Sequence, residues 1–182
     1  MESLMLKPRV IFETKNFIVR QCEISDKNGY LAFWDDPQVM QYIGDGTWGG
    51  GEKVIEQVIQ KNLDFYKIHP HFGFWAVIDK ETGGLVGEAG LSIVEETGEI
   101  EAGYILRQSY WGKGLGTELL NALIQYGFQT LNLEEIMAVA HPENAGSIRI
   151  MQKCGMQYCG TANYHNRLSV KYLIKNPNEF RS

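Results

Sequence analysis

The sequence of 182 residues has few cysteines, no long apolar run and no secretion signal. Its three cysteines form no CxxC pair and have no zinc-ligand spacing to histidine. An odd number is a poor basis for a disulfide framework, so we expect reduced thiols and a cytoplasmic location. No apolar run approaches the ~20 residues that span a bilayer, and residues 1–8 lack a basic segment followed by an apolar stretch. We therefore expect neither secretion nor a membrane partner.

Basic residues are also in short supply. Seventeen Lys and Arg stand against 22 Asp and Glu, which gives a formal net charge of −5. Proteins that track nucleic-acid phosphates usually show a basic footprint, so we do not expect direct nucleic-acid binding. The five prolines form no linker, and no repeat or low-complexity segment marks an internal boundary. With 44% hydrophobic residues and a length typical of one domain, residues 1–182 are predicted to form a single globular domain.

Hydrophobic periodicity changes along the chain and predicts a mixed α/β (α+β) protein. Two-residue alternation predicts strands, and apolar spacings of three or four predict helices. Strands are expected over residues 16–22, 74–78, 85–93, 99–106, 135–140 and 168–174. Helices are expected after Ser25 and Asp26, around residues 39–43, and over residues 52–66, 115–128 and 144–154. The three strands between residues 74 and 106 follow one another through short turns, which predicts an antiparallel meander.

The most informative segment is residues 111–117. Gly112, Gly114 and Gly116 alternate there and open a predicted helix. Glycines let backbone N–H groups converge on a ligand, and a helix N-terminus carries a partial positive charge, so the pattern predicts a phosphate site. A plain tight turn is the alternative. A nucleotide-triphosphate loop is excluded because Lys113 precedes a glycine, and a nucleotide-dependent oxidoreductase is disfavoured because the last glycine of its fingerprint is misplaced.

This segment resembles the coenzyme A pyrophosphate loop of the GCN5-related N-acetyltransferase (GNAT) superfamily, in particular its ribosomal-protein acetyltransferase-like branch. The superfamily pattern Arg/Gln-x-x-Gly-x-Gly/Ala lies on residues 111–116, and Trp111 departs from it at the first position. Other segments similar to the family are residues 17–20, 35–40, 100–104, 144–147 and 153–156. Together these segments span most of the chain in the family's order.

The resemblance implies a single GNAT-type domain, with a mixed, mostly antiparallel central sheet and helices on both faces. Its fourth and fifth strands, here residues 99–106 and 135–140, would start side by side and splay apart. The resemblance also implies acetyl-CoA as the co-substrate and no metal. The pantetheine arm would bond to backbone groups in the gap, the pyrophosphate to the glycine loop, and the 3′-phosphate to Lys113 or Arg107. The residues expected to bind acetyl-CoA are Ile105, Leu106, Arg107, Trp111, Gly112, Lys113, Gly114, Leu115, Gly116, Thr117, Asn144 and Ser147.

Amide formation from an amine and a thioester needs a neutral amine, a polarised carbonyl and a protonated leaving group. A backbone N–H at the end of the strand over residues 99–106 is the expected oxyanion donor. Glu101 is the first candidate for the general base, and Glu88 on a neighbouring strand is the second. The family often uses a tyrosine as the acid where this chain has Met151, so Ser147 is the predicted acid. A coenzyme A thiolate is also a good enough leaving group to depart without one.

The predicted function is transfer of an acetyl group to a primary amine, by direct attack in a ternary complex. The amine belongs to a protein N-terminus or to a small molecule, and a homodimer is compatible with the resemblance. A non-catalytic acyl-CoA-binding or regulatory module is the alternative, because Met151 replaces the usual acid. The acceptor is expected to depend on the early helices, on residues 158–167 and on residues 44–51, where Trp48 either covers a ligand or caps the core.

Overall fold

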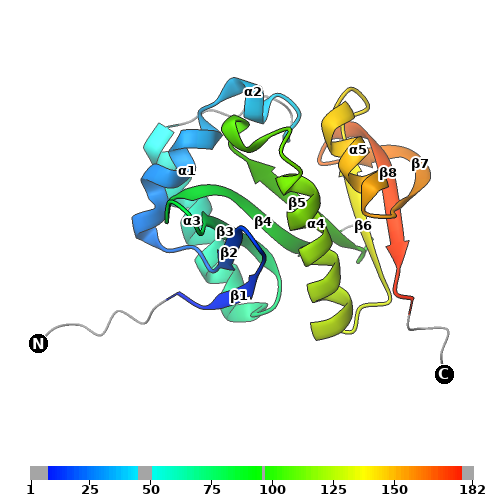
Figure 1. Ribbon diagram of the computed structural model, residues 1–182, viewed down its shortest axis with the longest axis horizontal. Coiled ribbons are helices and arrows are strands. Elements are labelled where there is room, and N and C mark those ends of the chain that lie inside the picture. The colour runs from blue at the N-terminus through cyan, green and yellow to red at the C-terminus, as the bar shows by residue number, and fades with distance from the viewer. Residues whose placement is uncertain (1–7, 45–50, 96, 178–182) are drawn as a thin grey trace, which may run out of the picture.

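One sheet of eight strands forms the centre of the protein (Figure 1). The computed structural model describes residues 8–44, 51–95 and 97–177. The strands are β1 (Val10–Glu13), β2 (Phe17–Arg20), β3 (Gly73–Asp79), β4 (Leu85–Ile93), β5 (Ile100–Leu106), β6 (Glu135–Ala140), β7 (Gln157–Tyr164) and β8 (Arg167–Lys175). Their order across the sheet is β1-β2-β3-β4-β5-β6-β8-β7. All neighbours pair antiparallel except β5 and β6, so the predicted mixed and mostly antiparallel sheet is confirmed.

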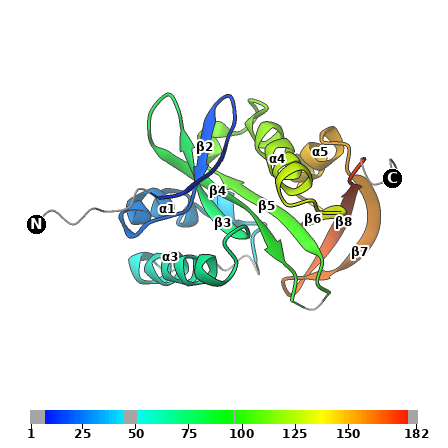
Figure 2. The same ribbon diagram turned by 90° about the horizontal axis from the view of Figure 1, so that it is seen from below.

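Helices cover both faces of the sheet, as predicted. They are α1 (Lys27–Trp34), α2 (Pro37–Met40), α3 (Gly51–Ile68), α4 (Leu115–Gln125) and α5 (Ala145–Lys153). Figure 2 shows α1 and α3 on one face and α4 and α5 on the other. The apolar stripe of α4 includes Leu119, Leu120 and Leu123, which are fully buried, as expected for an amphipathic helix packed on a sheet. None of the described helices is long and apolar enough to cross a membrane.

Two strands were not predicted from the sequence. In β1 three apolar residues follow one another, and β7 is exposed along most of its length, so neither shows the alternation of a half-buried strand. Both lie at the edges of the sheet, where burial constrains the sequence least. The predicted boundaries of β4 and β6, by contrast, are confirmed to the residue. Residues 45–50, which include Trp48 and belong to the segment 44–51 expected to influence the choice of acceptor, lie outside the described residues.

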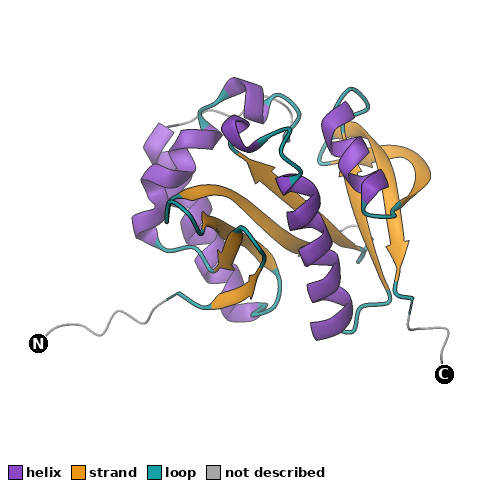
Figure 3. Ribbon diagram, viewed as in Figure 1, coloured by secondary structure: helices purple, strands orange, loops and turns teal. Residues whose placement is uncertain are grey.

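Strands β5 and β6 begin together and then diverge. Their register has one pair, Glu101 with Met137, whereas β4 and β5 pair from Gly87 with Leu106 to Ile93 with Ile100. The sheet is therefore two smaller sheets, β1–β5 and β6-β8-β7, that meet at one parallel pair, and both groups of strands are seen in Figure 3. The predicted splaying of these strands is confirmed.

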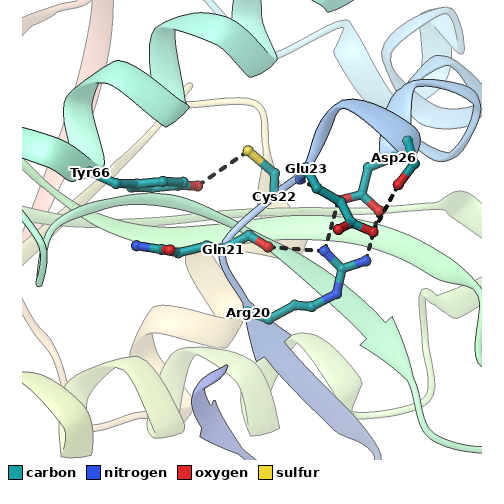
Figure 4. A network of polar contacts seen from close by, with 7 residues as sticks. Arg20, Gln21, Cys22, Glu23, Asp26 and Tyr66 are labelled. Atoms are coloured by element: carbon teal, nitrogen blue, oxygen red, sulfur yellow. Dashed lines mark hydrogen bonds and ion pairs between the residues drawn. The ribbon is translucent and has the colours of Figure 1, made fainter. Parts of the chain in front are cut away.

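A network of polar side chains fixes the segment between β2 and α1 (Figure 4). The Arg20 guanidinium makes two hydrogen bonds to the Asp26 carboxylate, at 2.7 and 2.8 Å, and this interaction raises the pKa of Arg20. The Cys22 thiol lies 3.4 Å from the Tyr66 hydroxyl of α3, and burial raises the pKa of Cys22 to about 11. These contacts attach the segment to α1 and α3, which cover the face of the sheet that includes Glu88.

Glu88 is a carboxyl group buried where β4 packs against α1. The residue is only 4% exposed. Burial raises the pKa of Glu88 to about 8, and hydrogen bonding by Trp34 of α1 opposes this rise by a smaller amount. The Oε2 atom of Glu88 has no hydrogen-bond partner of normal geometry in the described part of the chain. At pH 7 the Glu88 carboxyl is therefore protonated, and so neutral, in most of the molecules.

We expect Glu88 to make the folding stability depend on pH. In the unfolded chain this carboxyl has an ordinary pKa of 4.5, and in the folded protein the pKa is about 8. The folded state therefore holds a proton that the unfolded state has released, and the free energy of unfolding should fall as pH rises from about 4.5 to about 8. The variant Glu88→Gln should lose this slope, which is of the order of a few kcal/mol across that range.

Urea denaturation of both proteins at pH 5, 6, 7 and 8 measures the difference. Glu81→Gln, at an exposed position of the β3–β4 turn, is the matched control and should retain the wild-type slope. The same slope in Glu88→Gln and wild type would contradict a buried, protonated Glu88.

Candidate functional site

The opening between β5 and β6 exposes backbone groups of β5, among them those of Leu106. Neighbouring residues of a strand point their N–H and C=O groups to opposite sides. The Arg107 N–H donates to the Val86 carbonyl of β4 at 2.9 Å, and the Ile105 carbonyl also points toward β4, since a Cβ at Gly87 would lie 2.1 Å from it. The N–H and C=O of Leu106 therefore point to the other side, toward the opening. Of the two positions expected to bind the pantetheine arm, Leu106 faces the gap and Ile105 belongs to the β4 ladder.

The side chain of Trp111 completes this edge. Its indole Nε1–H donates to the Leu106 carbonyl at 2.8 Å, while the residue stays 44% exposed. Trp111 is the position that departs from the family's Arg/Gln pattern, and the structure gives it a direct contact with the backbone of the gap. The Leu106 N–H is then a donor that β5 presents to a ligand.

The glycine loop leads from the 3₁₀ turn Gln108–Tyr110 into α4. Gly112 and Gly114 have positive φ values of 73° and 79°, and a Cβ added at either position would point into open space. Gly116 serves a different purpose, because a Cβ there would lie 2.8 Å from Ile150 of α5. Because glycine has no Cβ, Gly116 leaves room for the end of the Ile150 side chain where α4 packs against α5. Two glycines thus set the conformation of the loop, and the third allows close packing of the helices.

The loop ends where the first turn of α4 begins. The amides of Leu115, Gly116 and Thr117 have no intrahelical acceptor, as in the first turn of any α-helix, and they carry the positive end of the helix dipole. With an open glycine loop in front of them, these amides are suited to a phosphate group.

The structure separates the two basic residues considered for the 3′-phosphate. Lys113 is exposed on the loop, with its Nζ 5.8 Å from the centre of the Tyr110 ring. Arg107 is half-buried, and its Nη2 donates to the Gly29 carbonyl of α1 at 3.3 Å. Lys113 is therefore the basic side chain that lies with the glycine loop, whereas Arg107 is held against α1.

The first turn of α5 reaches across to β5. The Asn144 side chain caps this helix by accepting a hydrogen bond from the Ser147 N–H at 3.1 Å. The Ser147 hydroxyl lies 3.5 Å from the hydroxyl of Tyr104 on β5. Burial raises the pKa of Tyr104 to about 12, so this tyrosine stays protonated at neutral pH. Met151, where the family often has a tyrosine, is 1% exposed and packs in the core.

Glu101 lies at the junction of the two half-sheets. It is 7% exposed, and its Oε2 is 2.8 Å from Nε2 of His165, in the turn between β7 and β8. By strand alternation its side chain lies on the same face as that of Ile105, which pairs with Glu88. Four residues of extended strand separate Glu101 from that pair, so Glu88 is about 13 Å away.

Two contacts at the candidate site are not indicated by the sequence. Tyr104 contacts Ser147, a residue 43 positions away in the sequence. His165 contacts Glu101 across 64 positions. His141 stacks on Tyr42, with 5.3 Å between ring centres. These pairings come from the tertiary fold, and no local pattern marks them.

Comparison with known proteins places this geometry in a family. The model of the acetyltransferase (GNAT) domain matches residues 16–157. The Bacillus subtilis protein described as the uncharacterized N-acetyltransferase YnaD is 31% identical over 147 residues, which cover 79% of this chain and 81% of YnaD.

Solved structures agree with the family match. A GNAT-family acetyltransferase from Bacillus anthracis superposes with a TM-score of 0.78 at 25% identity, covering 90% of this chain and 97% of that one. RimL, a ribosomal alpha-N-protein acetyltransferase solved in complex with coenzyme A, shares the fold with a TM-score of 0.76 at 14% identity, covering 92% and 98% of the two chains. With its single β5–β6 pair, its glycine loop and these matches, the chain belongs to the GNAT acetyltransferase family.

Proposed function

We propose that this N-acetyltransferase transfers an acetyl group from acetyl-CoA directly to a primary amine while both substrates are bound. The observation that carries the proposal is the one-pair junction between β5 and β6. Beyond it, the Leu106 amide faces an opening that has the first turns of α4 and α5 on its two sides. The pantetheine arm would lie against Leu106 like an added strand, and the pyrophosphate would lie on the amides of residues 112–117.

Other residues of the opening would complete the acetyl-CoA site. Lys113 is placed to meet the 3′-phosphate, and Asn144 would contact the pantetheine arm from the α5 side. The Trp111 indole donates a hydrogen bond to the Leu106 carbonyl, so its role would be to orient the part of β5 that the pantetheine arm contacts. Ile105 and Arg107 would act by fixing β5 to β4 and to α1.

Glu101 would act as the general base. An amine of lysine type has a reference pKa near 10.4 and is almost fully protonated at pH 7, so it must lose a proton before it attacks. Glu101 would accept that proton through water molecules along the face of the sheet that carries Gly103 and Ile105, because five residues of extended strand, about 16 Å, separate it from Leu106. The neutral amine then bonds to the thioester carbon, the C–S bond breaks, and the Leu106 N–H donates to the carbonyl oxygen as charge develops on it. Glu88 is the second candidate: its position next to the residue opposite Leu106 brings it closer to the reacting carbonyl, but burial raises its pKa to about 8, so at pH 7 it is mostly protonated.

Ser147 would supply the proton to the departing thiolate. Its hydroxyl stands at the start of α5, and the protonated Tyr104 hydroxyl beside it is able to donate in turn. The Met151 side chain lies in the core, so it takes no part in this step. The loss of the usual tyrosine also supports the second candidate function, a regulatory module that binds acyl-CoA without transferring the acyl group.

The acceptor is proposed to be a protein N-terminus or a small-molecule amine, and the likeness to RimL in fold supports testing N-terminal peptides first. The three unpaired cysteines are in keeping with a reducing, cytoplasmic location. The homodimer stays a prediction.

Release of coenzyme A thiol from acetyl-CoA tests the proposed function. We expect release with some members of a panel of free amines that includes N-terminal peptides, lysine and polyamines, and none with the same peptides N-acetylated. In Glu101→Gln, turnover at pH 7 should fall by about a hundredfold, the lower end for removal of a base. The deficit should shrink as pH rises, because more of the amine is then already neutral. Binding of acetyl-CoA without thiol release for any amine would favour the regulatory module instead.

The glycine loop offers a matched pair of variants. Gly114 and Gly83 both have positive φ, 79° and 70°, and both have open space where a Cβ would point. Valine at either position should therefore cost a similar, modest amount of stability, about 1–2 kcal/mol. Only Gly114→Val should also block the approach of a pyrophosphate, and we expect its affinity for acetyl-CoA to fall at least about tenfold.

Calorimetric titration with acetyl-CoA and thermal unfolding of the free proteins measure the two effects separately. In the wild type, acetyl-CoA at a hundredfold excess over its Kd should contribute about 2.7 kcal/mol of stability, whereas NAD and ATP should not shift the melting temperature. Equal loss of affinity in Gly83→Val and Gly114→Val would contradict the loop assignment.

A further inference from the structure

The turn between β7 and β8 holds His165 in an unusual backbone conformation. Tyr164 pairs with Arg167, which leaves His165 and Asn166 as a two-residue hairpin loop. Their φ values are 53° and 60°. Positive φ at both central residues is the mark of a type I′ turn, in which glycine and asparagine are favoured. Positive φ is uncommon for residues other than glycine, and histidine is one of those enriched there. A conformation of this kind persists when surrounding contacts hold it in place.

Contacts on two sides hold this turn. On one side, Arg167 Nη1 donates to the Gln41 carbonyl at 3.1 Å and to the Gly44 carbonyl at 3.4 Å, just beyond α2. On the other side, the Tyr164 hydroxyl donates to Glu99 at 3.2 Å, and Lys171 forms an ion pair with the same carboxylate. The hairpin is thereby fixed against β5.

The fixed turn presents the imidazole of His165 to Glu101. The Nε2–Oε2 distance is 2.8 Å, and the two side chains differ in exposure, 58% for His165 and 9% for Glu101. The buried carboxylate therefore contacts an imidazole that reaches solvent. Imidazoles take up and release protons between about pH 5 and 8, which suits them to carry protons.

We propose that His165 is a positioning residue for Glu101 and the outlet through which the proton taken from the acceptor amine reaches solvent. This inference rests on the proposed role of Glu101 as the base. In the step, the ammonium group of the acceptor gives a proton to the Glu101 carboxylate and becomes a neutral amine. Glu101 then passes a proton from Oε2 to the unprotonated Nε2 of a neutral His165, whose own proton is on Nδ1. The imidazolium releases its Nδ1 proton to water, and proton exchange with solvent at the two ring nitrogens returns the imidazole to its starting tautomer. The carboxylate and the neutral imidazole are restored, and one proton has moved from the acceptor to solvent.

Among the described residues, the charged groups around the pair do not supply an alternative proton carrier near neutral pH. Glu99, just before β5, and Lys171 of β8 face the pair. Their mutual hydrogen bond lowers the pKa of Glu99 and raises the pKa of Lys171. Both therefore stay charged, with opposite signs. Tyr164 of β7 donates to Glu99. On β4, Ser92 pairs with Glu101, and Glu88 is about 13 Å along the sheet.

The test compares His165→Asn, Asn166→Gly and Glu101→Gln in thiol-release assays. Asparagine tolerates positive φ but carries no titratable group, and Asn166→Gly changes the same turn without touching Glu101. For His165→Asn we expect kcat at pH 7 to fall by about tenfold in dilute buffer, less than for loss of the base itself, with KM for acetyl-CoA unchanged. Added imidazole should restore much of that loss, whereas Asn166→Gly, which retains His165, should gain no activity from added imidazole.

The outcomes separate this inference from the proposed function. If Glu101→Gln loses turnover but His165→Asn has the wild-type pH profile at every buffer concentration, His165 is not the outlet although Glu101 is the base. A loss in His165→Asn that imidazole does not restore, accompanied by an equal loss in Asn166→Gly, makes the turn structural and also overturns the inference. If Glu101→Gln turns over at the wild-type rate, the proposed base itself is wrong. Thermal unfolding of the three variants shows whether each one folds.

Discussion

The two halves of the sheet meet at one parallel pair, Glu101 on β5 with Met137 on β6, and the rest of the site depends on this junction. A parallel connection requires a crossover, and α4 with its preceding glycine loop provides it. Because the strands part beyond the pair, the Leu106 amide faces an opening in the described sheet, and the first turns of α4 and α5 lie beside that opening. A fully paired β5–β6 ladder would use the same backbone groups internally and leave no edge for a pantetheine arm.

The junction also gathers side chains from both halves of the chain. Glu101 and Tyr104 come from β5, whereas His165 and Ser147 come from the hairpin and helix of the second half-sheet. Each cross-contact pairs one residue from either side of the opening, at 2.8 Å for Glu101 and His165 and at 3.5 Å for Tyr104 and Ser147. The same contacts that close the fold thus place the proposed base and the proposed acid. Glu88, on the neighbouring strand, is the second candidate for the base, and burial raises its pKa to about 8.

Sequence patterns predicted those features that are encoded locally. Strands β4 and β6 followed from alternation and apolar runs, and the glycine loop followed from three glycines before a helix. Edge strands β1 and β7 did not follow, because β1 has three apolar residues in succession and β7 is mostly exposed, so neither shows the alternation of a half-buried strand. Whether Leu106 or Ile105 faces the opening depends on the register between β4 and β5. The different surroundings of Gly114 and Gly116 depend on how α5 packs against α4. Contacts such as that of His165 with Glu101 arise only once the hairpin is docked, so no spacing in the sequence indicates them.

The proposal that the pantetheine arm lies along β5 at Leu106 is tested most directly by amide hydrogen exchange at that residue. The neighbouring amide of Arg107 is bonded to Val86 in the β4 ladder and serves as an internal control. On addition of acetyl-CoA, we expect slower exchange at Leu106 and across residues 112–117, with little change at Arg107. Protection of the loop amides without protection of Leu106 would mean that the phosphates bind while no pantetheine arm lies along β5, and it would contradict the proposed site.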